Sequence, residues 1–192
     1  MDWLQLQPLC PPDHCRVANC FHRTYFVDDD DHVIGTATRG EIHRQALKHR
    51  STHIMVLDGE GRVLLQKRSM QKDQFGGMWD TACAGHVEAG ESYSETAPRE
   101  LQEELGITAD APLTECFKMP PTKDNGQEFA MVYSLEHRGP FTPADDEIDE
   151  LRWYSCKEVD DWLERVSGLH DKQKDLTSGF IEIWHRFREH YA

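Results

Sequence analysis

The stretch from Gly85 to Ile107 crowds glutamates into a short space, reading GHVEAGESYSETAPRELQEELGI. Its Glu100, Glu103 and Glu104 are spaced three and four residues apart, so on an α-helix they share one side. A divalent cation would remove their mutual repulsion, because Mg²⁺ and Mn²⁺ prefer carboxylate, carbonyl and water oxygens. The same spacing also suits a solvated acidic face in which Arg99 pairs with Glu103. Helical spacing alone leaves both interpretations open.

A capped helix is predicted to carry these acids. Ser92 with Glu95 three residues later forms a capping-box pattern, and Gly106 is a helix stop, so we expect a helix over 93–105. An apolar stripe adjoins the carboxylates and consists of Ala97, Leu101 and Leu105. Pro98 departs from this pattern because it removes a backbone hydrogen bond. We therefore expect a distorted first turn or a later helix start.

The remaining elements alternate between short strands and helices. The clearest hairpin is THIMVLDGEGRVLLQKRS, residues 52–69, in which glycines supply the tight turn. Further expected strands are two around the acidic turn Asp28–Asp31, then 78–85, 113–119, 128–136 and 148–155. Further expected helices are 39–47 capped by Thr38, 157–166 capped by Ser155 with Glu158, and one within 176–191 that buries Phe180, Ile183, Trp184 and Phe187. Hairpins among interleaved helices favour the α/β class of the α+β type, with a mixed sheet covered by helices.

The composition indicates one globular domain and an acidic surface. The chain has 192 residues, and 35 acidic against 21 basic side chains give a formal charge of −14. Such a charge argues against nucleic-acid and membrane-surface partners, which need a positive footprint. A polyanionic substrate would need local basic groups or a metal. We expect no membrane span, no signal peptide and a cytoplasmic location.

The first residues differ from the rest in lacking hydrophobic periodicity. We interpret 1–23 as an N-terminal extension and 24–192 as the folded domain. The extension contains thiols and imidazoles that could bind zinc in principle, although their spacing matches no tight ligand pattern. These residues are Cys10, Cys15, Cys20, His14 and His22.

The loop before the acidic helix completes a family signature. Gly85, then Glu91 after five residues, then RELQEELGI after seven more, fits every fixed position of the Nudix box. The chain thus resembles Nudix hydrolases, and the resemblance extends from about Tyr25 to Leu163. It implies an α/β/α sandwich with a mixed sheet, and it allows a homodimer.

The resemblance also implies roles for individual residues. Mg²⁺ or Mn²⁺ would activate water against a diphosphate linkage in a nucleotide or other organic diphosphate. The implied metal ligands are Glu100, Glu103, Glu104 and the carbonyl of Gly85. The implied catalytic and orienting residues are Glu103, Arg99, Glu91 and a loop carboxylate, Glu147, which also suits an ordinary solvated acid. His86 could touch this site or serve a structural purpose.

Substrate-binding residues are harder to infer. Phosphate neighbours are predicted among Lys67, Arg68 and Lys72, and a base could stack on Trp79, Phe75 or Tyr133. Each of these positions equally suits a structural role, since strand aromatics usually pack and hairpin cations are usually solvated.

Two other functions remain as alternatives. The segment from Gly35 to Glu91 also resembles isopentenyl diphosphate isomerases, which rely on a Cys immediately before Gly-His. That position here is Ala84, and the neighbouring Cys83 would point to the opposite face of a strand. Of the isomerases' Glu-x-Glu pair only Glu128 remains. The other alternative, a Nudix-like module that binds nucleotide without turnover, would be expected to have a broken box, and this box is complete.

Overall fold

The computed structural model describes residues 23–72, 74–108, 112–170 and 173–191. The thiols Cys10, Cys15 and Cys20, and the rest of the proposed extension up to residue 22, lie outside the described residues.

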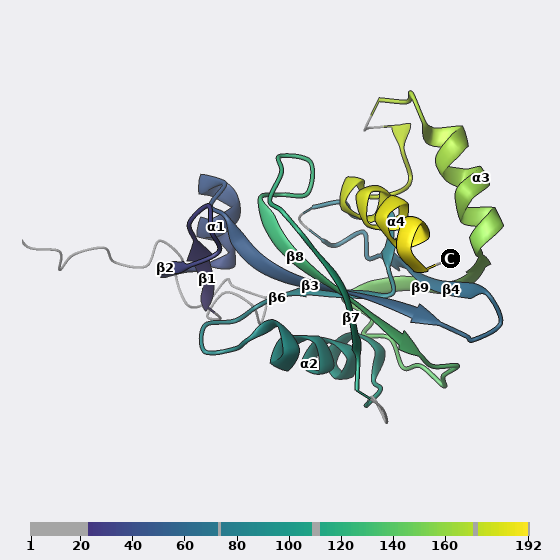
Figure 1. Ribbon diagram of the computed structural model, residues 1–192, viewed down its shortest axis with the longest axis horizontal. Coiled ribbons are helices and arrows are strands. Elements are labelled where there is room, and N and C mark those ends of the chain that lie inside the picture. The colour runs from purple at the N-terminus through teal and green to yellow at the C-terminus, as the bar shows by residue number, and fades with distance from the viewer. Residues whose placement is uncertain (1–22, 73, 109–111, 171–172, 192) are drawn as a thin grey trace, which may run out of the picture.

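A nine-stranded mixed sheet forms the centre of the described chain (Figure 1). Its strands are β1 (Arg23–Val27), β2 (Val33–Thr38), β3 (His49–Leu57), β4 (Arg62–Arg68), β5 (Trp79–Thr81), β6 (Cys83–His86), β7 (Thr114–Met119), β8 (Glu128–Glu136) and β9 (Ile148–Ser155). β3 is the central strand: it runs parallel to β8 and antiparallel to β1, β4 and β6. The predicted mixed sheet and α+β class are confirmed.

Helices cover both faces of this sheet (Figure 1). One face carries α2 (Tyr93–Leu105) and the other carries α3 (Cys156–Val166) and α4 (Ser178–Tyr191), whereas α1 (Arg39–Gln45) lies beside β1 and β2. Side chains alternate across a strand, so Ile54 and Val56 of β3 pack with α2, whereas Met55 packs with α3 and α4. The result is the three-layer α/β/α arrangement that the resemblance implied.

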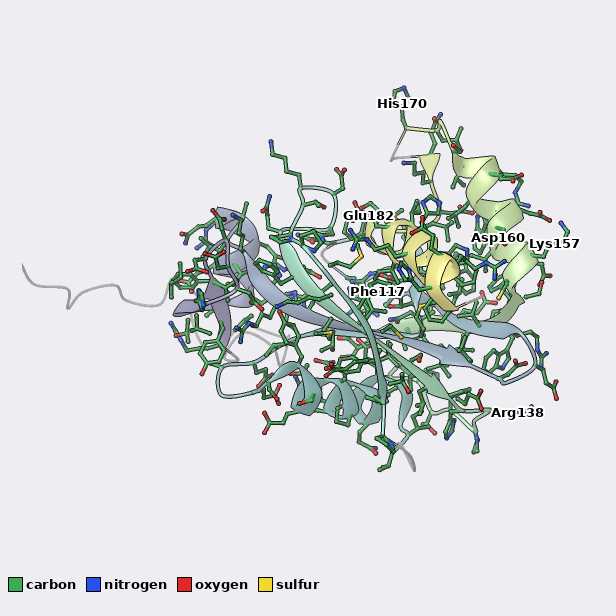
Figure 2. All side chains as sticks on the ribbon, viewed as in Figure 1. Phe117, Arg138, Lys157, Asp160, His170 and Glu182 are labelled. Carbon is green, nitrogen blue, oxygen red and sulfur yellow. The ribbon has the colours of Figure 1, made fainter. Side chains whose placement is uncertain are left out.

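The α3 and α4 layer is joined by polar contacts as well as by apolar packing. Asp160 of α3, labelled in Figure 2, accepts hydrogen bonds from Trp184 Nε1 at 2.8 Å and from Arg188 Nη2 at 3.1 Å. The predicted apolar face of α4 is confirmed, because Phe180, Ile183, Trp184 and Phe187 are all buried. Among the described residues, no helix is long and apolar enough to cross a membrane.

The sheet splits next to β4. β3 pairs with β4 only near their shared turn, through Val56 with Leu64 and Leu57 with Val63. Beyond that point β4 pairs with β5, while β3 pairs with β6. The prediction of a single strand over 78–85 is therefore wrong, because the chain changes partner at Ala82. The split opens the sheet beside Gly85.

Helix α2 begins where its cap predicts. Ser92 N–H donates to Glu95 Oε2 at 2.8 Å, and Thr96 N–H donates to Ser92 O at 3.0 Å, an ordinary first-turn bond. The expected later start is wrong, because Pro98 is the sixth residue of the helix and removes a bond only after the first turn has formed.

Candidate active site

The box glutamates divide into buried and exposed positions on α2. Glu100 and Glu104 are 8% and 6% exposed and face the sheet, whereas the side chain of Glu103 is 59% exposed. Gly85 of β6 lies directly against Glu100: a Cβ built at Gly85 would lie 2.0 Å from Glu100 Cδ. The structure thus brings the predicted carbonyl ligand and one predicted carboxylate ligand into contact, with no room for a side chain between them.

Arg99 links the loop to the helix acids. Its guanidinium binds Glu91 in a bidentate manner, with Nε and Nη2 at 2.8 and 2.9 Å from the two carboxylate oxygens. The remaining nitrogen, Nη1, lies 2.9 Å from both Glu100 Oε1 and Glu103 Oε2. The hydrogen bonds from Arg99 hold the pKa of Glu91 below its ordinary value. Arg99 therefore holds three of the predicted site carboxylates in one network.

Burial makes the charged form of both glutamates, Glu100 and Glu104, unfavourable. Glu104 Oε2 accepts from Ala84 N–H at 3.2 Å and from Gln66 Nε2 at 3.3 Å. Burial nevertheless raises the pKa of Glu104, and burial together with the neighbouring Glu104 raises the pKa of Glu100 to about 7. Carboxylates held in this way, beside an approachable carbonyl, form an all-oxygen donor set that fits Mg²⁺ or Mn²⁺.

Glu147 reaches the same region from the loop before β9. Its carboxylate forms an ion pair with Lys72, and its carbonyl accepts from Ser69 N–H at 2.9 Å. Burial lowers the pKa of Lys72 to about 8, although Glu104 and Glu100 favour its charged form. Glu147 and Lys72 thus form a mutually neutralised pair within electrostatic reach of the buried glutamates.

A cleft opens beside Gly85. Three basic side chains line it, Arg39, Arg68 and Lys72, and Phe75 lies at its wall. Among the described residues that line the cleft, Ser51 Oγ, Arg68 Nε and His86 Nδ1 are buried without a hydrogen-bond partner. Buried polar atoms of this kind are uncommon, so these groups are available to a ligand or to water.

Not all the predicted substrate residues reach this cleft. Trp79 is 7% exposed and packs edge-on against Tyr154 and Trp162, between the sheet and α3. Lys67 is paired in the sheet with Trp79 and Glu150 and does not line the cleft. Of Arg68, Lys67 and Trp79, the structure therefore brings only Arg68 to the cleft.

The aromatic predictions also separate. Phe75 lines the cleft, whereas Tyr133 is buried in the apolar cluster under α2. A stacking role at the cleft is therefore available to Phe75 and not to Tyr133.

The sequence interpretation missed a cluster of histidines on the cleft wall. His43, His49 and His86 have side-chain nitrogens within 4.8 Å of one another, beside Glu128 and His53. Burial lowers the pKa of His86 to about 3. Burial would raise the pKa of Glu128, but hydrogen bonds from His49, His53 and His86 hold it well below the ordinary value. One available signal was the four-residue spacing of His49 and His53, which places both on one face of a strand.

Comparisons with known proteins agree with this geometry. The family model described as NUDIX domain matches residues 47–175. The chain belongs to the Nudix hydrolase family. An uncharacterized Nudix hydrolase of Escherichia coli K12, YfcD, is 37% identical over 133 residues, which cover 69% of this chain and 73% of that protein. The crystal structure of DR0079 from Deinococcus radiodurans shares the fold with a TM-score of 0.72 at 23% identity, covering 88% of this chain and 99% of that one.

An isomerase is also among the relatives of this Nudix chain. The isopentenyl-diphosphate Delta-isomerase of Serratia proteamaculans is 31% identical over 168 residues, covering 83% of this chain and 94% of that protein. The position before Gly85-His86 is Ala84, which has no thiol, and Cys83 is fully buried in the α2 cluster. Burial raises the pKa of Cys83 well above its ordinary value, so its thiol stays protonated.

Proposed function

We propose that this protein is a divalent-metal-dependent hydrolase that cleaves the diphosphate linkage of a nucleotide or another organic diphosphate. One observation carries the proposal: buried Glu100 lies against Gly85, and buried Glu104 accepts from Ala84 N–H, beside the cleft that Ala84 and Gly85 line. Burying two carboxylates with few donors is costly unless a cation compensates them. Arg39, Arg68 and Lys72 would supply local positive charge to a polyanionic substrate in this cleft, which Asp80, Asp124 and Glu128 also line.

Mg²⁺ or Mn²⁺ would be held by Glu100, Glu103, Glu104 and the Gly85 carbonyl. When bound, the ion would lower the pKa of water and screen the charge of the phosphates. Arg99 Nη1 donates to one oxygen of Glu100 and to one oxygen of Glu103, so the second oxygen of each carboxylate remains available to the cation. The bidentate pair with Glu91 can stay in place and keep the guanidinium close by.

Glu147 is the proposed proton acceptor. In the free protein its carboxylate is paired with Lys72. Phosphate oxygens in the cleft would compete for that ammonium group, because Lys72 lines the cleft. Glu147 would then be free to accept the proton of the attacking water, while Lys72 and Arg68 hold the substrate.

A panel of organic diphosphates, assayed with Mg²⁺ and with Mn²⁺, tests the proposal when product analysis reports which bond breaks. We expect turnover of at least one member, and a fall of about two to four orders of magnitude in Glu103→Gln. Glu164→Gln, on the exposed face of α3, is the matched control and should retain wild-type activity.

Three outcomes would overturn the proposal. Binding of a nucleotide without turnover across the whole panel would favour a non-catalytic module. Conversion of isopentenyl diphosphate to its allylic isomer would establish the isomerase instead. Equal activity of Glu103→Gln and wild type would remove the box from the mechanism.

A homodimer, a cytoplasmic location and the expectation of no nucleic-acid or membrane partner remain predictions from the sequence.

A further inference from the structure

One hydroxyl group under helix α2 is buried without a hydrogen-bond partner among the described residues. Thr52 of β3 is 0% exposed, and its Oγ1 has no partner. A buried hydroxyl in this state destabilises the fold. Valine would fill nearly the same space without that penalty, because it is branched at Cβ as threonine is. Packing therefore does not explain why this position carries a hydroxyl.

The side chain of Thr52 lies on the face of the sheet that α2 covers. Helix α2 packs against β3 and β6 (Figure 1). Side chains alternate along a strand, so Thr52 shares a face with Ile54, which belongs to the apolar cluster under α2. Ser51 lies on the opposite face and lines the cleft. The Thr52 hydroxyl is therefore on the side of the box helix, across the sheet from the histidines.

The register of β3 with β6 places Thr52 directly opposite Gly85. In an antiparallel pair, the Cβ atoms of opposite residues lie on the same face, about 4.5–5.5 Å apart. Gly85 has no Cβ, and Glu100 fills that space: an added Cβ would lie 2.0 Å from both Cδ and Oε1 of Glu100. The carboxylate of Glu100 therefore takes the place of the side chain that would face Thr52 across the strands.

The carboxylate of Glu100 can accept a further hydrogen bond. Its Oε1 accepts from Arg99 Nη1 at 2.9 Å, and an ionised carboxylate offers about four lone-pair sites. The partner of Thr52 on the other side is Met131 of β8, whose thioether is only a weak acceptor. Thr52 is not hydrogen-bonded to Glu100 in the free protein, so the contact needs a small shift of Glu100 or one bridging water.

We propose that Thr52 is a positioning residue of the box: when a divalent cation binds, its hydroxyl donates to the carboxylate of Glu100, directly or through one water. The inference rests on the proposed function only for the cation that Glu100 holds. Carboxylates that bind a metal are themselves commonly oriented by hydrogen bonds. Arg99 orients Glu100 from within α2, and Thr52 orients it from the sheet.

Two substitutions separate the hydroxyl of Thr52 from its methyl group. Thr52→Val removes only the hydroxyl, so the metal-free protein should have an unchanged or higher midpoint of denaturant unfolding. Its Mg²⁺ affinity, measured by calorimetric titration without substrate, should fall about 10- to 100-fold, as when other groups that orient a metal ligand are lost. Thr52→Ser leaves a small cavity but keeps the hydroxyl, so it should unfold at lower denaturant and retain most of the Mg²⁺ affinity. A purely structural role would not separate stability from affinity in this way.

A double-mutant cycle tests whether Thr52 acts through Glu100. Glu100→Gln weakens Mg²⁺ by itself, and adding Thr52→Val should weaken it little further, because the partner of the hydroxyl has already changed. The signal of bound Mn²⁺ in electron paramagnetic resonance extends the cycle to weakly binding variants. Ser51→Ala is the matched control: it removes the neighbouring buried, unpartnered hydroxyl from the opposite face of β3 and should keep wild-type Mg²⁺ affinity.

The inference fails on any of three results. Wild-type Mg²⁺ affinity in Thr52→Val would show that the hydroxyl does not position a metal ligand. A lower midpoint of unfolding in metal-free Thr52→Val would show that the hydroxyl holds a structural water instead. Effects of Thr52→Val and Glu100→Gln that simply add would show that Thr52 acts elsewhere.

The hydrolase proposal can fail separately. Weaker Mg²⁺ binding by Thr52→Val in a protein that turns over no diphosphate would leave the positioning role in place and remove the activity. Turnover by a Thr52→Val protein with wild-type Mg²⁺ affinity would do the reverse. A wild-type chain that binds neither Mg²⁺ nor Mn²⁺ would remove both.

Discussion

At the scale of single residues, the site depends on close contacts that leave no space for a different side chain. Arg99 donates to Glu91, Glu100 and Glu103 with one guanidinium, which only a planar, five-donor group can do. Glu100 in turn occupies the space that a side chain at Gly85 would need. The box therefore requires a particular residue at each of these positions for steric as well as electrostatic reasons.

Gly85→Ala should disrupt the site without any strain in the backbone. Its Cβ would lie 2.0 Å from Glu100, which must move, so we expect a loss of stability of about 1–3 kcal/mol and weaker binding of the box cation. Denaturant unfolding and Mg²⁺ titration measure the two effects. Gly40→Ala is the control, because a Cβ at this exposed helical position meets nothing within 4 Å. The substitution should raise the free energy of unfolding by up to about 1 kcal/mol. Wild-type Mg²⁺ affinity in Gly85→Ala would contradict the proposed contact.

At the scale of helices and strands, the sequence was sufficient to predict an element wherever the interaction that defines it joins residues close together in the chain. The cap residue Thr38 and the capping boxes at Ser92 and Ser155 located three helices, because each cap is satisfied within three residues. The change of partner at Ala82 escaped prediction, since hydrophobic alternation is the same whichever strand is the neighbour. The histidine cluster escaped for the same reason: only the register of β3 with β6 and β8 brings His49, His86 and Glu128 together.

Pro98 removes one backbone hydrogen bond within α2, and its replacement measures what that bond contributes to stability. The residue is exposed and lies in the second turn, where a restored N–H could bond to the carbonyl of Ser94. We expect Pro98→Ala to stabilise the protein by about 1–3 kcal/mol and to leave activity unchanged, because the acids follow the proline. Thermal unfolding and steady-state kinetics measure both quantities. A stability loss, or a fall in activity of tenfold or more, would show that the ring has a role beyond the helix backbone.

At the scale of the whole molecule, charge is distributed unevenly. The chain carries a formal charge of −14, yet Arg39, Arg68 and Lys72 gather at one cleft. The sequence indicated that a polyanionic substrate would need such a cluster, but only the fold shows which basic residues form it. Lys67 and Arg68 are neighbours on β4, but only Arg68 lines the cleft, because adjacent residues of a strand point to opposite faces.

This distribution makes the stability of the metal-free protein depend on pH in a defined direction. Burial and Glu104 raise the pKa of Glu100 from 4.5 to about 7, so the folded state keeps a proton that the unfolded chain releases. Stability contributed by that proton is present below about pH 4.5 and is lost as the pH rises through about 7, by on the order of 3 kcal/mol at most. The raised pKa of Glu104 acts in the same direction.

Denaturant unfolding between about pH 5 and pH 8, with a chelator present, measures this loss as the difference between wild type and Glu100→Gln. Groups other than Glu100 titrate in both proteins, so their contributions cancel in this difference. Any advantage of wild type over Glu100→Gln in the free energy of unfolding should shrink or change sign as the pH rises. Added Mg²⁺ should restore the stability of wild type near pH 8 and have less effect on Glu100→Gln, since the ion binds the deprotonated carboxylate. If the free energies of unfolding of the two metal-free proteins change with pH in parallel, the pKa of Glu100 is not raised by folding. Arg99 would then already neutralise Glu100, and burial would give no reason for a cation to bind there.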